Sequence, residues 1–270
     1  MVFISLINLN GNNYMDNNSL ASKEHWETTY ENIKYAEVSD NSEISVWLKE
    51  QIKDNFNNHK TCFEIGISPS SYSTIFGKMG YQINGIDRVS EVNKSMKEWL
   101  LHKGYNVGNL FCEDFFEFNA NIKYDIVCSF GFIEHFKNYE QIIRKQASLV
   151  KENGIIIIET PNLRGVVQFL LKKFFDKKIL DVHYIPSMNF NKWEKILKEE
   201  GFEIINREYL GKFSFEIYPQ KRNKFQILLI EFIFRSRYFL KKYIFRKISR
   251  HYSPYMALIA KKTQHFNSFL

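Results

Sequence analysis

The stretch from residue 61 to residue 88 constrains the fold most, because it reads as strand, turn, helix and second strand. An apolar run, Thr61–Ile65, ends at Gly66, and the helical pattern that follows is closed by Gly80, a typical helix-ending glycine. The second strand stops at Asp87, about 20 residues after the glycine turn, where a nucleoside-binding βαβ unit places an acid on the ribose hydroxyls. The stretch therefore predicts a parallel sheet with a nucleoside site at its edge.

The turn between the two strands contains too few glycines for a diphosphate site. A dinucleotide fingerprint uses three glycines, because the backbone and a helix N-terminus must approach the pyrophosphate closely. Here Gly66 is followed by Ile67, Ser68 and Pro69. The sequence thus disfavours a nicotinamide-dependent oxidoreductase and favours a nucleoside cofactor without phosphates. S-adenosylmethionine is such a cofactor.

This turn resembles motif I of the class I S-adenosylmethionine-dependent methyltransferases. In that family an acid, one further residue and a glycine open the loop under the methionine moiety, as Glu64-Ile65-Gly66 does here. The family usually continues with a cysteine and two glycines, where this chain has Ile67-Ser68-Pro69. The resemblance implies that Glu64 lies near the cofactor's amino group, directly or through water, and that Asp87 binds the ribose. A buried Glu64 that accepts from loop amides is compatible with this role.

The exit of the third expected strand resembles the family's adenine site. At Cys112-Glu113-Asp114-Phe115-Phe116 the family places a carboxylate that accepts from the exocyclic amine, so the resemblance implies Asp114 for this contact. Phe115 or Phe116 would then flank the adenine ring. The alternatives are that Asp114 caps a turn and that the phenylalanines pack in the core.

The segment after the fourth expected strand is also similar to the family pattern, in which a small residue is followed by a glutamate and a histidine. The resemblance implies that Ser129, Phe130 and Gly131 line the pocket beneath the sulfonium, at the carboxyl end of the sheet. An N-terminal tryptophan and tyrosine pair, here Trp26 and Tyr30, often covers the methionine end. The alternative is that both rings pack their helix onto the sheet.

Methyl transfer to an alcohol needs a group that takes the acceptor's proton. The displacement itself is in line, so alignment supplies most of the acceleration and a metal is not required. A base within hydrogen-bond reach of the acceptor is useful. The candidates are His135, His183 and Glu134, since all three are expected near the carboxyl edge of the sheet. The alternative for His135 is that it only caps its helix.

Cysteine spacing and the N-terminal sequence indicate a cytoplasmic protein. Cys62, Cys112 and Cys128 include no CxxC pair, so neither a disulfide framework nor a metal site is expected. Residues 1–10 are apolar but too short to span a bilayer, and they lack a basic leader region. Met15 is an alternative start to Met1.

The order of elements predicts a Rossmann-like α/β fold with a doubly wound, mostly parallel seven-stranded sheet and an antiparallel last strand. Two amphipathic helices, in 22–35 and 42–56, precede the first strand. Later helices are expected at 90–103, 142–150, 163–175 and 191–200, and later strands at 105–111, 124–129, 155–158, 202–208 and 253–262. Residues 151–154 are expected to form an exit turn.

The chain divides into a disordered N-terminal tail at 1–20, a methyltransferase domain at 21–220 and 252–264, and a basic amphipathic helical insertion at 221–251. Lys221 to Arg250 holds ten Lys or Arg and one acid, which leaves 27 basic and 29 acidic residues elsewhere, so the net charge of +7 comes from this segment. Five charges, on Lys224, Glu231, Arg235, Lys242 and Arg246, recur with helical spacing.

The apolar arc of this insertion is too wide for an isolated surface helix. It packs onto the domain, forms a homodimer or other partner interface, or lies in a membrane interface with its basic residues toward anionic headgroups. Nucleic acid is disfavoured, because the basic residues alternate with large aliphatic side chains that need burial.

These observations predict an S-adenosylmethionine-dependent methyltransferase. The expected reaction is O-methylation of a small molecule, a sugar or a lipid-linked envelope precursor, in the cytoplasm and peripherally at the inner face of the membrane. The alternative is a catalytically inactive, methyltransferase-like binding or scaffold protein associated with a membrane or a partner.

Overall fold

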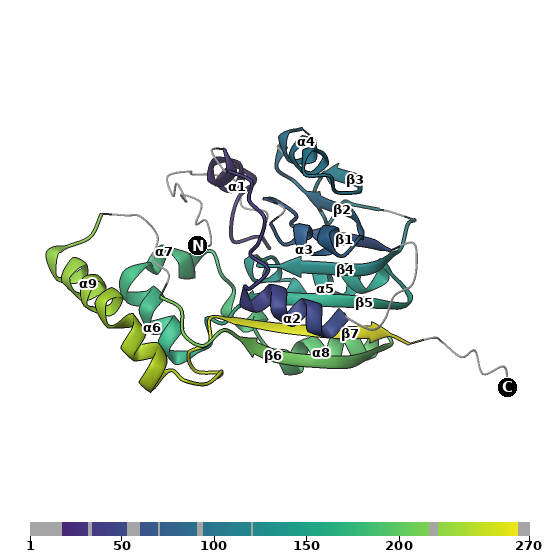
Figure 1. The fold of residues 1–270 in the computed structure, drawn as a ribbon. Helices are drawn as coiled ribbons and strands as arrows, with labels where there is room; N and C mark the ends of the chain where they lie inside the picture. Colours follow the sequence, from purple (N-terminus) through teal and green to yellow (C-terminus); the bar gives the residue numbers. More distant parts are fainter. Residues whose placement is uncertain are drawn as a thin grey trace.

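The structure, a computed structural model, describes residues 18–31, 34–52, 60–69, 71–90, 94–119, 121–215 and 221–263. Its centre is a seven-stranded sheet with the order β3-β2-β1-β4-β5-β7-β6 (Figure 1). The strands are β1 (Thr61–Ile65), β2 (Gln82–Asp87), β3 (Val107–Cys112), β4 (Tyr124–Phe130), β5 (Val150–Pro161), β6 (Phe202–Leu210) and β7 (Tyr255–Lys262). β7 runs antiparallel to both β5 and β6, whereas β1 to β5 pair in parallel. The Rossmann-like sheet with an antiparallel last strand is therefore confirmed.

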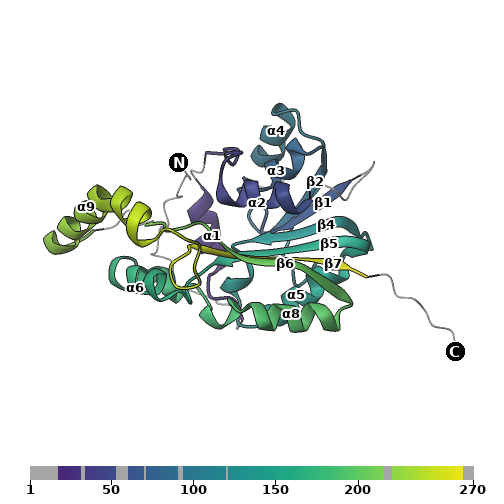
Figure 2. The same ribbon diagram turned by 60° about the horizontal axis from the view of Figure 1, so that its bottom comes forward.

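Helices flank the sheet on both faces (Figure 2). One face carries α2 (Glu43–Ile52), α3 (Ser73–Lys78) and α4 (Ser95–His102), and the other carries α5 (Tyr139–Ser148) and α8 (Phe190–Glu199). Beyond one end of the sheet lie α6 (Val166–Phe175), α7 (Lys177–Asp181) and α9 (Lys224–Phe239), and α1 (Lys23–Tyr30) precedes the domain.

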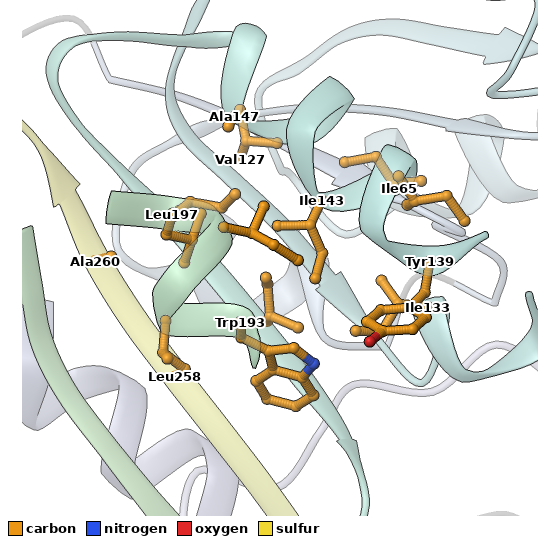
Figure 3. Close-up of a cluster of buried hydrophobic side chains, with 14 of the residues drawn as sticks. Ile65, Val127, Ile133, Tyr139, Ile143, Ala147, Trp193, Leu197, Leu258 and Ala260 are labelled. Atoms are coloured by element: carbon orange, nitrogen blue, oxygen red, sulfur yellow. The ribbon is translucent and has the colours of Figure 1, made fainter. Parts of the chain in front are cut away.

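Apolar side chains cover both faces of the sheet, as a central parallel strand requires. In β5 the run Ile155–Ile158 is fully buried, and successive side chains point to opposite faces. The second and fourth isoleucines join a core cluster with α5 and α8, whereas the first and third join a cluster with α2 and α3. Figure 3 shows part of the first cluster, in which Val127 and Leu258 of the sheet pack together with Ile143 and Trp193 of the helices.

The direction of strand addition reverses at β1. The chain adds β2 and β3 on one side of β1 and later returns to pair β4 on the other side. Open α/β sheets bind their ligands at such a switch point, at the carboxyl ends of the strands. The exits of β1 and β2 meet there, because the N–H groups of Gly66 and Ile67 both donate to the carbonyl of Ile86 (2.9 and 3.2 Å).

Several element boundaries differ from those expected from the sequence. The helix expected at 142–150 is α5, which begins and ends earlier, because Val150 pairs with Tyr124 and so starts β5. Residues 151–154, expected as an exit turn, continue this strand, with Asn153 in the left-handed region (φ 61°). His135 ends a single 3-10 turn, Ile133–His135, rather than opening a helix.

The described end of the expected N-terminal tail packs on the domain. Ser19 is 3% exposed and forms an isolated antiparallel bridge with Phe136. The N–H of Leu20 donates to the carbonyl of His135 (2.8 Å), and the N–H of Lys137 donates to the carbonyl of Asn18 (2.8 Å). Disorder was expected through residue 20, so this boundary was wrong for residues 18–20. Residues 1–17 of that tail lie outside the described residues.

The basic insertion forms α9, followed by a π-helical turn at Leu240–Ile244. Asn223 caps α9, since its side chain accepts from the N–H of Gln226 (2.8 Å). No residue of α9 is buried. Arg246, the last member of the expected charge stripe, lies beyond the helical part. None of the helices in the described part of the chain combines the length and apolarity needed to cross a bilayer.

A core substitution tests the two-faced sheet. Leu258→Ala removes a fully buried side chain from β7, and we expect a loss of about 2–5 kcal/mol in the free energy of unfolding, because a cavity remains. Ile205→Ala on β6 is the matched control, since Ile205 is 42% exposed and should lose far less. Urea denaturation of both variants measures the difference. Equal losses would contradict this account of the core.

Candidate active site

A cleft opens at the carboxyl ends of β1 to β4, at the switch point of the sheet. It spans about 650 Å³ including its open mouth. Eight of the twelve candidate site residues line it, namely Tyr30, Gly66, Asp87, Asp114, Phe115, Phe130, Gly131 and His135. The other four, Glu64, Ser129, Glu134 and His183, lie behind its wall or beside it. The fold thus brings together residues that are far apart in the sequence.

Gly66 shapes the floor of the cleft. Its φ of 72° lies in the left-handed region, which side chains other than glycine rarely adopt. A Cβ at this position would also lie 2.5 Å from Cδ2 of Phe132, which is closer than two nonbonded carbon atoms approach each other. Phe132 lines the cleft and was not among the candidate residues. Its position depends on this glycine, a relation that the sequence alone does not reveal.

Asp87 ends β2 with its carboxylate in the cleft. Oδ2 accepts from the N–H of Ser68 (3.1 Å) and Oδ1 accepts from the N–H of Val89 (3.2 Å). Each oxygen keeps a second lone pair, so the carboxylate can also accept from a pair of vicinal hydroxyls. Burial raises the pKa of Asp87 to about 6. This geometry fits a ribose.

Asp114 lines the cleft next to the exit of β2, where the N–H of its neighbour Glu113 donates to the carbonyl of Asp87 (3.1 Å). Oδ1 of Asp114 accepts from the N–H of Phe116 (2.8 Å), so Asp114 does cap a turn, as the alternative proposed. Its Oδ2 lies 3.7 Å from Nη1 of Arg88, in a half-exposed position that lets it accept from a ligand amine as well. Arg88 lines the cleft and was missed by the sequence analysis; its guanidinium also donates to the carbonyl of Ala21 (2.7 Å).

The aromatic residues next to Asp114 pack at the core and also line the cleft. Phe115 is 5% exposed and belongs to a core cluster, yet it forms part of the cleft wall. Phe116 is partly buried and also lines the cleft. Their packing fixes an apolar surface beside Asp114 that suits a flat aromatic ring.

Glu64 lies behind Gly66, at the end of β1. It is 3% exposed, and the hydroxyl of Ser73 on α3 donates to its Oε2. Burial raises the pKa of Glu64 to about 8, with a smaller contribution from the nearby charge of Asp87. A cationic amino group brought next to Glu64 would favour its ionised form.

Ser129 does not offer its side chain to the cleft. It is fully buried, and its hydroxyl pairs with the side chain of Gln146 on α5 (3.1 Å). The expectation that all of Ser129, Phe130 and Gly131 line the pocket is therefore wrong for the side chain of Ser129. Successive residues of a strand point to opposite faces, so only its neighbour Phe130 reaches the cleft with a side chain. Gly131 follows with a φ of 63°.

The three candidate bases form one cluster. Glu134, His135 and His183 each offer a ligand or proton-accepting atom within 4.8 Å of the others. The centroids of the two imidazole rings are 4.7 Å apart. His135 alone among the three lines the cleft. Burial lowers the pKa of both histidines, to about 4 for His183, so both rings are neutral at physiological pH.

The N-terminal aromatic pair covers this cluster. Trp26 and Tyr30 on α1 stack with centroids 5.9 Å apart, and both line the cleft. Trp26 also meets the ring of His135 edge-on at 4.7 Å. The segment before α1 is held to the same place by the bridge of Ser19 with Phe136. Tyr30 thus lines the cleft, and its contact with the methionine end of the cofactor stays a prediction.

A second, wider cavity adjoins the cleft on the other side of Gly66. It spans about 2180 Å³ including its open mouth, and Tyr30, Gly66, Ser68 and Phe130 line both spaces. Its remaining wall includes Glu64 and the segment before α2. The insertion contributes Arg237 and Lys241, and the residues that flank the insertion contribute Lys212, Phe213 and Tyr255. The cavity therefore runs from the cleft to α9.

The family model for the methyltransferase domain matches residues 41–208, which is more than half of the chain. The chain belongs to this family. Together with the sheet order, the match makes it a class I S-adenosylmethionine-dependent methyltransferase, an enzyme with S-adenosylmethionine as cofactor. The resemblance drawn from motif I is thereby confirmed.

Solved structures share the fold of this methyltransferase at low identity. A magnesium protoporphyrin IX methyltransferase from Synechocystis PCC 6803, with bound S-adenosylhomocysteine, is 16% identical with a TM-score of 0.52, covering 82% of this chain and 80% of the other. A S-adenosylmethionine-dependent methyltransferase from Archaeoglobus fulgidus is 19% identical with a TM-score of 0.52, covering 82% and 94%. The [4+2]-cyclase SpnF is 14% identical with a TM-score of 0.53, covering 85% and 86%. These likenesses show the fold and not the reaction.

One curated relative is a ubiquinone biosynthesis O-methyltransferase from Rickettsia canadensis (strain McKiel). It is 24% identical over 165 residues, which cover 59% of this chain. The matched part spans 66% of the relative's own length, slightly less than two thirds.

A pair of glycine substitutions tests the floor of the cleft. Gly66→Ala should lose roughly 1–3 kcal/mol of unfolding free energy from backbone strain, and more from the clash with Phe132. Gly80→Ala is the matched control, because Gly80 has a similar φ of 83° but no atom within 4 Å of the added Cβ. Thermal unfolding compares the two, and S-adenosylhomocysteine binding should weaken only for Gly66→Ala. A Gly80→Ala variant damaged as badly as Gly66→Ala would exclude the steric explanation.

Burial of Glu64 predicts a pH dependence of stability. Its folded pKa of about 8 lies above the ordinary 4.5, so the folded state holds the proton more tightly than the unfolded state. The contribution of Glu64 to the free energy of unfolding is therefore most favourable below pH 4.5. It is lost as the pH rises from 4.5 to about 8, and the free energy of unfolding falls by up to about 1.4 kcal/mol per pH unit in that range. Glu64→Gln should remove this slope, whereas Glu203→Gln, an exposed substitution on β6, should retain it. Urea titrations at a series of pH values measure both.

Proposed function

We propose that this methyltransferase transfers a methyl group to a hydroxyl oxygen of an acceptor presented at a membrane surface. The acceptor is a small molecule, a sugar or a lipid-linked envelope precursor. The observation that carries the proposal is the wide cavity that runs from Gly66 to Arg237 and Lys241 of the insertion. An acceptor that enters beside α9 can thus reach the cofactor cleft.

The residues of the cleft divide into contacts for the parts of the cofactor. Asp87 accepts from the ribose hydroxyls, Asp114 accepts from the adenine amine, and Phe115 flanks the adenine ring. Gly66, Phe130 and Gly131 lie beneath the methionine end, with Glu64 toward its amino group and Tyr30 above it. S-adenosylmethionine, when bound, supplies the electrophilic methyl group. The protein holds the acceptor oxygen in line with that group, and such alignment carries most of the rate.

An acceptor hydroxyl must lose its proton at or near the transition state. The cluster of Glu134, His135 and His183 is the proposed group that activates it, because His135 reaches the cleft and the other two lie directly behind it. The O-methyltransferase from Rickettsia canadensis supports oxygen as the methylated atom.

The surface of α9 supports a membrane-bound acceptor. Phe225, Leu228, Phe232 and Phe239 have spacings of three, four and seven residues, so they share a face, and each is 55–66% exposed. The large exposed area is unusual for a surface that meets only water.

Helix α6 extends this apolar surface. Val166, Leu170 and Phe174 are 46–56% exposed at four-residue spacing on α6. The two helices are joined where Gln226 donates to the carbonyl of Phe174 (2.9 Å). The segment from Lys221 to Arg250 carries ten basic residues and one acid. An apolar face with a basic surround fits the interface of an anionic bilayer, with the enzyme peripheral at the cytoplasmic face.

Binding of S-adenosylhomocysteine tests the cofactor contacts. Asp87→Asn and Asp114→Asn should each weaken binding by about 10- to 100-fold, because a hydrogen bond to a charged group is worth about 1.5–3 kcal/mol. Glu117→Gln is the matched control, an exposed acid three residues after Asp114 and outside the cleft. Isothermal titration calorimetry measures all four proteins. Absence of binding to the unsubstituted protein would favour the inactive scaffold instead.

Sedimentation with vesicles tests the membrane surface. The protein should co-sediment with phosphatidylglycerol vesicles and less with phosphatidylcholine vesicles, and added salt should release it. Replacing Phe225, Leu228 and Phe232 by serine should abolish co-sedimentation. Leu101→Ser with Ile122→Ser is the control, since these apolar residues are about half exposed (51% and 50%) but do not belong to α9. The membrane proposal would be overturned if the unsubstituted protein did not bind vesicles but formed a dimer, and if the serine variant were monomeric.

A further inference from the structure

Glu134, His135 and His183 come from two separate parts of the chain. Glu134 and His135 belong to the 3-10 turn after β4, and His183 follows α7. The two parts are tied together because the N–H of Tyr184 donates to the carbonyl of Glu134 (2.6 Å). Among the described residues, this is the one group of three metal-ligating side chains with its donor atoms mutually within 4.8 Å.

Both histidines are held by backbone carbonyls. Nδ1 of His135 lies 2.7 Å from the carbonyl of Val182, and Nδ1 of His183 lies 2.6 Å from the carbonyl of Ile179. A carbonyl oxygen only accepts, so each Nδ1 must carry the hydrogen. In the neutral rings Nε2 then presents a lone pair. Histidines that ligate metals are oriented by this kind of second hydrogen bond.

The carboxyl group of Glu134 is the third potential donor at the same place. Glu134 is 1% exposed, and its Oε2 has no hydrogen-bond partner within the described residues. Its Oε1 lies 4.0 Å from Nε2 of His135. An isolated buried carboxylate is costly unless a cation or a proton compensates it. The three side chains thus each place one potential donor atom within 4.8 Å of the others, and one oxygen of Glu134 has no hydrogen-bond partner within the described residues.

We propose that Glu134, His135 and His183 bind a divalent transition-metal ion of the zinc class, through the carboxylate and both Nε2 atoms. Two histidines and one glutamate form a common ligand set for zinc with an open coordination position. Zinc bonds of about 2.0–2.2 Å require the donor atoms to close by about an ångström. Zinc is preferred over magnesium because two of the three donors are imidazole nitrogens.

The site adjoins the cleft through His135. If the proposed O-methylation is correct, on which this step rests, an acceptor hydroxyl that occupies the open position is deprotonated more easily, because a bound metal lowers the pKa of its oxygen ligand. The proton goes to solvent or buffer. The oxygen would then form a bond to the methyl carbon as the bond from that carbon to the sulfonium sulfur breaks, and S-adenosylhomocysteine would leave. Metal binding itself does not depend on the identity of the acceptor.

Metal content of the untagged, full-length protein tests the site. After loading with ZnCl₂ and dialysis against metal-free buffer, we expect one equivalent of zinc by mass spectrometry. Loading with CoCl₂ instead should give visible absorption of cobalt with nitrogen and oxygen ligands. Glu134→Gln, His135→Gln and His183→Gln should each weaken zinc binding at least 10-fold. His102→Gln, an exposed histidine on α4, is the matched control and should retain the metal.

Two further measurements separate the possible failures. S-adenosylhomocysteine binding should persist in His183→Gln, which shows that the variant folds and that the cofactor site is intact. Zinc that remains bound in all three variants, or an unsubstituted protein that retains none, would overturn the metal site and favour a proton shared between Glu134 and His135. Loss of cofactor binding in the unsubstituted protein, with zinc retained, would instead count against the proposed function.

Discussion

The cleft depends on one backbone arrangement, in which the N–H groups of Gly66 and Ile67 both donate to the carbonyl of Ile86. These bonds join the exit of β1 to the exit of β2. They also bring Ser68 to the carboxylate of Asp87. The left-handed conformation of Gly66 makes the turn possible and leaves room for the ring of Phe132. A single turn therefore positions the acid and the aromatic wall of the cofactor cleft.

Much of the fold was predictable because local patterns of apolar residues and glycines in the sequence indicate its strands and helices. The spacing from Gly66 to Asp87 predicted the βαβ unit, and the run Ile155–Ile158 predicted a strand, which the structure buries on both faces. The antiparallel last strand followed from the family resemblance. Helix boundaries were less predictable, since the start of β5 is set by its pairing with Tyr124 and not by local propensity.

The candidate site was predictable only where residues follow a strand or carry a family motif. Phe132 and Arg88 were missed, because their places in the cleft depend on packing against Gly66 and Ala21. Ser129 was assigned to the pocket, but strand alternation turns its hydroxyl toward Gln146. The contact of His183 with His135 joins distant segments, and neither periodicity nor spacing could have revealed it.

The insertion that carries α9 leaves and re-enters the sheet at adjacent points, because Leu210, the last residue of β6, pairs with Tyr255, the first of β7. The two strands would thus remain in register if a short hairpin turn joined them. The sheet and the cofactor cleft do not need the helix for their own geometry. The length and sequence of this segment can therefore change without disturbing the pairing of the two strands on either side of it.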